Sequence, residues 1–146
     1  MKKMLITAMM LATLASSAAL SSAAGTAYSP AQSGNYERYV GKYPSDLFKG
    51  EPALKTRLLA LLGRNYGLFM SHLGVEMPIE NDQGGLVVRG CLPHSCTTED
   101  GILVIDLGTG KLHVAILSQK FGGRFRTFSE DRAHIPAALK RAMSQP

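Results

Sequence analysis

The chain has 146 residues, two cysteines, no tryptophan and a formal net charge of +5. A chain of this length suits one domain with one core. The basic residues are scattered rather than gathered in a stripe, which excludes the charge pattern of a nucleic-acid binder, and the lack of tryptophan excludes a tryptophan-lined sugar platform.

Residues 1–24 have the pattern of a secretory signal peptide. Lys2 and Lys3 precede an uncharged apolar run from Met4 to Leu14, and Ser22-Ala23-Ala24 predicts cleavage after residue 24, with cleavage after residue 27 as the alternative. The run is too short to span a bilayer, and no later segment is apolar enough, so we expect no stable membrane anchor. The pattern predicts export to a bacterial periplasm, with a mature chain of about +3.

The mature chain, 28–146, is expected to form a single domain that starts with helices. Residues 28–43 are polar and predict an ordered coil or loose arm, and one helical turn follows at 45–49. Pro52 suits the start of a longer helix and Gly63 its end, before a second short helix. The apolar residues between them share one face at helical spacing: Leu54, Leu58, Leu61 and Leu62.

After residue 74 the pattern changes to short extended segments. We expect strands at 75–79, 86–91, 102–107, 112–116 and 124–128, then a last helix at 135–143. Pro78 suggests an edge position for the first strand. Short connections between consecutive strands favour an antiparallel meander. The predicted fold class is therefore α+β, an antiparallel sheet of about five strands with flanking helices on one face.

The segment Cys91-Leu92-Pro93-His94-Ser95-Cys96 connects the second and third predicted strands and contains both cysteines of the chain. In an oxidising compartment these cysteines are expected to form a disulfide. Pro93 fixes a backbone dihedral beside His94, so we expect a rigid protrusion with an imidazole near its tip. Such a loop loses little entropy on entering a cleft. The alternative is a plain structural staple, although so small a ring contributes only about 2 kcal/mol.

Other site chemistry finds less support in the sequence. Cys91, His94 and Cys96 lack the further ligand cluster that a zinc site needs, and a Cys-x-x-Cys redox motif is absent. Three acidic residues are expected to face solvent in turns and strands: Glu99, Asp100 and Asp106. The histidines are expected to be structural, with His72 on a helix flank, His113 on the polar face of a strand and His134 just before the last helix. We therefore expect no catalytic set, no metal, no cofactor and no enzyme activity.

The segment Gly90–Cys96 resembles the signature loop of the Ivy family, inhibitors of vertebrate C-type lysozyme, which reads Cys-Lys-Pro-His-Asp-Cys. Leu61-Leu62-Gly63, the strand 103–106 and the helix at Pro136 are also similar to members of this family. The resemblance implies an exported protein with a central antiparallel sheet and flanking helices. It also implies that the loop enters the lysozyme cleft.

In that resemblance His94 corresponds to the histidine that hydrogen-bonds the catalytic carboxyl groups, and Cys91 and Cys96 to the disulfide. The family's lysine and aspartate are replaced by Leu92 and Ser95. A retaining glycosidase uses two carboxyl groups about 5 Å apart, and one imidazole can bind both through its two nitrogens. The implied target-binding loop is residues 91–96.

The function implied is inhibition of a C-type lysozyme or a related muramidase such as a lytic transglycosylase. Two other classes stay open on the sequence alone. One is a periplasmic structural or stress protein with no enzyme target, and the other is a small hydrolase. The sequence leaves monomer and homodimer equally open.

Overall fold

The computed structural model describes residues 35–145. The predicted signal peptide, both cleavage positions and the first part of the predicted arm lie outside this range. In the described part of the arm, Tyr36–Tyr39 form a 3-10 helix, η2, whereas residue 35 and residues 40–43 are turn or irregular backbone. Its two tyrosines, Tyr36 and Tyr39, are buried in the main core. Burial of these rings explains why a polar segment is ordered here.

Three helices follow and largely match the sequence prediction. Helix α1 is Pro44–Gly50, α2 is Pro52–Leu62 and, after a 3-10 turn η3 at Gly63–Asn65, α3 is Tyr66–Ser71. Helix α2 begins at Pro52, whose fixed φ suits the first helical position, and ends before Gly63. Leu54, Leu58 and Leu62 form its buried face.

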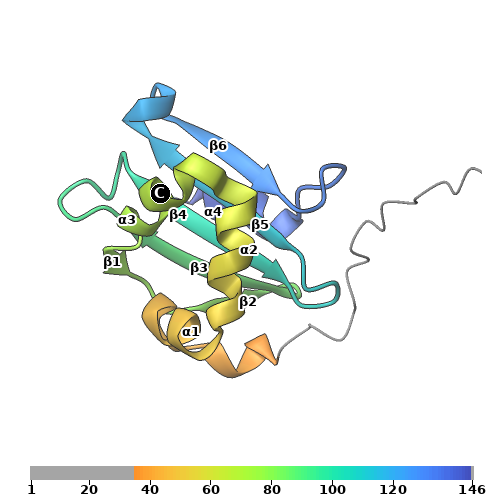
Figure 1. Ribbon diagram of the computed structural model, residues 1–146. Helices are drawn as coiled ribbons and strands as arrows, with labels where there is room; N and C mark the ends of the chain where they lie inside the picture. The colour runs from red at the N-terminus through yellow and green to blue at the C-terminus, as the bar shows by residue number, and fades with distance from the viewer. Residues whose placement is uncertain (1–34, 146) are drawn as a thin grey trace, which may run out of the picture.

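Within the described range, six strands form one antiparallel sheet. They are β1 Val75–Glu76, β2 Glu80–Asp82, β3 Gly85–Cys91, β4 Asp100–Asp106, β5 Leu112–Ser118 and β6 Arg124–Ser129. The order is β1-β3-β4-β5-β6, and β2 also pairs with β3 (Figure 1). Of the predicted first strand, 75–79, only Val75–Glu76 is a strand; β2 follows at Glu80–Asp82, with Pro78 in the gap between them. A proline cannot donate to a strand ladder, which explains the interruption.

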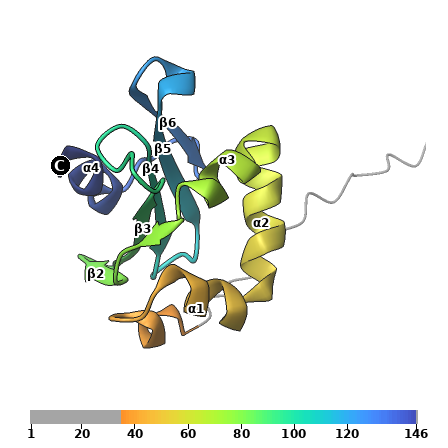
Figure 2. The same cartoon turned by 90° about the vertical axis from the view of Figure 1, so that its left-hand side faces the viewer.

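The α+β class is confirmed, but the prediction that the helices lie on one face is wrong. Helices α1–α3 cover one face, whereas the last helix, α4 Ala137–Ser144, packs on the other (Figure 2). In β4, Leu103 and Ile105 face the first core, while Ile102 and Val104 face α4. A strand buried on both faces is a continuous apolar run, and 102–105 has that pattern.

Two connections lie together at one end of the sheet (Figure 1). The β3–β4 loop leaves the sheet where Cys91 pairs with Asp100. The β5–β6 connection leaves it where Ser118 pairs with Arg124, and contains the 3-10 helix η4, Gln119–Phe121. This end, which we call the loop end, carries the predicted binding segment. Among residues 35–145, none of the helices is long and apolar enough to cross a membrane.

Candidate functional site

The predicted binding segment forms a disulfide-closed loop at the loop end. Cys91, the last residue of β3, is bonded to Cys96, with their Cα atoms 4.9 Å apart. Cys91 is fully buried and Cys96 is exposed. The ring is therefore anchored in the sheet through one cysteine and projects from it through the other.

A tight turn forms the tip of the ring. The backbone N–H of Ser95 donates to the carbonyl oxygen of Leu92 at 3.0 Å, with Pro93 and His94 between them. His94 has a φ of 65° and an exposed side chain. Proline at the second position and positive φ at the third are typical of a type II turn. Positive φ is uncommon for a residue other than glycine and costs of the order of 1 kcal/mol.

The loop is also held from outside the ring. The Leu92 N–H donates to the Glu99 carbonyl at 3.1 Å, and the Glu99 N–H donates to the Ser95 carbonyl at 2.9 Å. Pro93 lies directly over Gly74, since a Cβ added at Gly74 would be 2.9 Å from Pro93 Cδ. These contacts hold the turn in one orientation relative to the sheet.

Glu99 connects the loop to the helical face through its side chain. One carboxylate oxygen lies 2.6 Å from Nε2 of His72, and the other accepts from the Gln119 N–H at 2.9 Å. The His72 ring is fully buried, and its Nδ1 lies 2.6 Å from the Leu68 carbonyl oxygen. One side chain therefore joins the end of α3, the loop and η4.

The charge on Glu99 follows from these contacts. Burial alone would raise the pKa of the Glu99 carboxyl. Hydrogen bonds from the Gln119 N–H, the Ser118 hydroxyl and the His72 ring outweigh that effect, so the pKa lies below its usual value. Glu99 is therefore ionised at neutral pH, and the His72 contact is charge-assisted.

The next residue, Asp100, is also buried. Its carboxylate accepts from Arg89 Nε at 2.9 Å, and the Arg89 guanidinium also donates to the Gln145 carbonyl oxygen at 3.1 Å. An open cavity of about 430 Å³ lies beside this pair, between the exposed half of the disulfide and the end of α4. Its apolar walls are Met77, Leu117, Phe125 and Met143. The cavity adds concave surface next to the loop that a binding partner can contact.

The structure corrects several sequence expectations about single polar residues. Glu99 and Asp100 were expected to face solvent, but Asp100 is 2 % exposed and the Glu99 side chain 14 %. His72 was expected on a helix flank and His113 on the polar face of a strand, and both are buried. Sequence reasoning missed the His72–Glu99 pair because the two residues are 27 positions apart and neither belongs to a motif.

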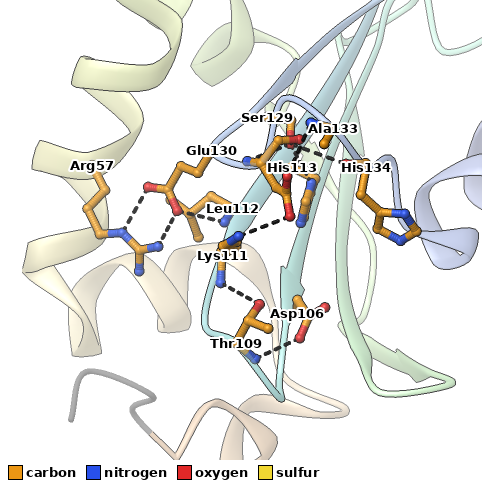
Figure 3. Close-up of polar contacts among 11 residues, drawn as sticks. Arg57, Asp106, Thr109, Lys111, Leu112, His113, Ser129, Glu130, Ala133 and His134 are labelled. Atoms are coloured by element: carbon orange, nitrogen blue, oxygen red, sulfur yellow. Dashed lines mark hydrogen bonds and ion pairs between the residues drawn. The ribbon is translucent and has the colours of Figure 1, made fainter. Parts of the chain in front are cut away.

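The structure also bears on the hydrolase alternative, because it brings a serine and a histidine together. Ser129 Oγ lies 2.8 Å from His113 Nδ1 at the end of the sheet opposite the loop (Figure 3). The hydroxyl donates to the carbonyl oxygen of Asp131, which closes a turn. Burial lowers the pKa of His113, and the ring is enclosed. A nucleophile needs an accessible hydroxyl whose proton goes to the histidine, and this pair does not provide one.

Metal binding finds no support in the described part of the chain. Across residues 35–145, no group of three or more histidine, cysteine, aspartate or glutamate side chains is placed to hold a metal ion. The cysteines of the loop are bonded to each other, so they offer no thiolate ligand.

Comparison with known proteins gives one positive result. A family model described as "Inhibitor of vertebrate lysozyme (Ivy)" matches residues 53–145, which is more than half of the chain and includes the loop. No curated protein and no solved structure matches the chain. With the disulfide-closed loop on an α+β sheet and this match, the chain belongs to the Ivy family of lysozyme inhibitors.

Proposed function

We propose that this protein is exported to the periplasm and inhibits a C-type lysozyme or a related muramidase by inserting the loop 91–96 into the catalytic cleft. His94 is the residue that reaches the catalytic carboxyl groups. The protein itself performs no reaction in this proposal.

One observation carries the proposal: an exposed imidazole sits at the tip of a closed ring, on a residue with a φ of 65°. Backbone strain at an exposed position brings no packing benefit, so it indicates a requirement on where the side chain points. The disulfide, the Glu99 hydrogen bonds and the Pro93 contact all restrict the same turn. A turn restricted in this way is ordered before binding, which lowers the entropy cost of insertion.

The chemistry of the imidazole matches the proposed site. A retaining muramidase needs one protonated and one ionised carboxyl group about 5 Å apart. The two ring nitrogens of His94 lie on opposite sides of the ring and can hydrogen-bond both groups at once. The proton donor and the stabilising carboxylate would then both be occupied, and the loop would exclude the sugar from the cleft.

The decisive experiment compares two histidine substitutions. His94→Gly removes the imidazole but tolerates the positive φ, and the disulfide still closes the ring. His134→Ala is the matched control, because His134 is also exposed and lies outside the loop. Inhibition constants would be measured against a C-type lysozyme, with melting curves for each variant.

We expect His94→Gly to weaken inhibition about 30-fold or more, which corresponds to the roughly 2 kcal/mol of an interface hot spot. The control should inhibit like the wild type, and all three proteins should melt at similar temperatures. Equal inhibition by wild type and His94→Gly would overturn the role of His94. Failure of the wild type to inhibit any muramidase tested would favour a structural protein without an enzyme target.

A further inference from the structure

The loop end carries a group of basic side chains beside the loop. Lys120 is exposed on η4, and Arg124 and Arg126 are exposed on β6. The Arg126 guanidinium lies over the rings of Phe121 and Phe128, at 5.3 and 5.7 Å from their centroids. We call Lys120, Arg124 and Arg126 the basic flank.

The acidic residues near this end are already bound to other groups. Glu99 accepts from His72 and Gln119, and Asp100 accepts from Arg89. Glu76 on β1 accepts from both the backbone and the hydroxyl of Ser45, at 2.9 and 2.8 Å.

Among the ion pairs formed within residues 35–145, none involves a residue of the basic flank. The basic flank therefore presents three exposed positive charges that form no ion pair with a carboxylate of the described residues.

The basic flank lies close enough to the loop to meet the same partner. Arg124 on β6 pairs with Ser118 on β5. Two residues further along β6, Arg126 pairs with Ile116 on β5, which in turn pairs with Gly101 on β4. Strands β3 and β6 are separated by three strand spacings of ~4.8 Å, or about 14 Å. A standard interface buries ~800 Å² per partner, a disc of about 16 Å radius. A partner of standard interface size centred on the loop therefore extends far enough to reach the basic flank.

We propose that the basic flank contacts an acidic rim beside the catalytic cleft of the target, so that this protein prefers a muramidase with an acidic surface to a basic one. This inference rests on the proposed function and specifies the target's charge. Rim charges act mainly on the association rate and its salt dependence, so the preference appears chiefly in the rate of binding. The flank selects the partner, and His94 blocks the catalytic groups.

The test uses one enzyme in two charge states. The probes are a basic C-type lysozyme and the same lysozyme with its lysines succinylated, which replaces ammonium groups by carboxylates. Association rates would be measured with immobilised inhibitor at low and at physiological salt. The flank variant is Lys120→Glu with Arg124→Glu; Arg126 is left unchanged because it packs on two aromatic rings. The control is Lys49→Glu with Lys55→Glu, two exposed residues on α1 and α2 with the same charge change.

We expect the wild type and the control to associate about tenfold faster with the succinylated enzyme than with the basic one at low salt. The flank variant should lose or reverse this ratio, and added salt should reduce the difference. An unchanged ratio in the flank variant would overturn the basic-flank proposal. If His94→Gly still weakens binding in that case, the proposed function stands; if the wild type binds neither enzyme form and inhibits no other muramidase, both proposals fail.

Discussion

Nε2 of the buried His72 ring lies 2.6 Å from a carboxylate oxygen of Glu99, and Nδ1 lies 2.6 Å from the Leu68 carbonyl oxygen. The Leu68 carbonyl oxygen can only accept a hydrogen bond, so Nδ1 is the donor in that contact. The His72–Glu99 contact joins the C-terminal end of α3 to the residue that supports the loop through its own backbone. The orientation of the loop thus depends on the hydrogen-bonded pair His72–Glu99 in the protein body as well as on the disulfide.

Glu99→Gln is expected to destabilise the protein by about 1–3 kcal/mol, because a buried hydrogen bond to a charged group is lost. Inhibition should weaken several-fold as the loop loses its support. Urea unfolding and the inhibition constant would measure the two effects. Glu37→Gln in η2 is the control, since Glu37 is exposed and should change neither. A Glu99→Gln protein with wild-type stability would contradict the proposed support.

The stabilisation from Glu99 should also depend on pH. The pKa of Glu99 is lower in the folded protein than its usual 4.5. Its contribution is therefore fully present above about pH 4.5 and is lost as the pH falls through the folded-state pKa. The stability difference between wild type and Glu99→Gln should stay constant near neutral pH and shrink in acid. Urea unfolding at a series of pH values would measure it, and a difference that grows in acid would contradict this assignment.

The disulfide should be present in the protein as isolated. The intact mass is then lower than that of the reduced chain by two hydrogen atoms, because Cys91 and Cys96 are bonded. Replacing both cysteines by serine should cost about 2 kcal/mol of stability, since the closed ring is small. The same change should weaken inhibition by loosening the turn. Two free thiols in freshly isolated protein would contradict the closed ring.

The substitution Gly74→Ala should displace the turn that contains Pro93. Gly74→Ala places a Cβ 2.9 Å from Pro93 Cδ, closer than van der Waals contact allows, so the turn must shift. We expect several-fold weaker inhibition with a smaller effect on the melting temperature. Gly67→Ala is the control, because a Cβ there meets nothing within 4 Å and alanine favours the helix. Equal inhibition by both variants would show that the Pro93 contact does not position the loop.

Local signals account for the parts of the fold that the sequence predicted well. Pro52 and Gly63 mark the start and the end of α2, and alternating apolar residues predict β5. The second covered face was harder to predict. The apolar stripe of α4, which includes Ala138, Leu139 and Ala142, predicts that the helix packs on the sheet, but a stripe does not show which face of the sheet the helix covers.

The candidate site also has a part that the sequence predicts and a part that only the fold reveals. Cys91, Pro93, His94 and Cys96 are close in sequence, so a motif can reveal them. The support from His72 and Glu99 depends on tertiary structure that places α3 beside the end of β4. In the sequence Glu99 follows two threonines and precedes an aspartate, a polar run that is typical of an exposed turn. Only the fold shows that this run turns inward.

The position of α4 also affects when the molecule can fold. In the described part of the chain α4 comes after every strand, yet it covers Val87, Ile102 and Val104. These side chains have no cover on that face until residues 137–144 are available. A nascent chain therefore lacks part of its core until α4 has been synthesised.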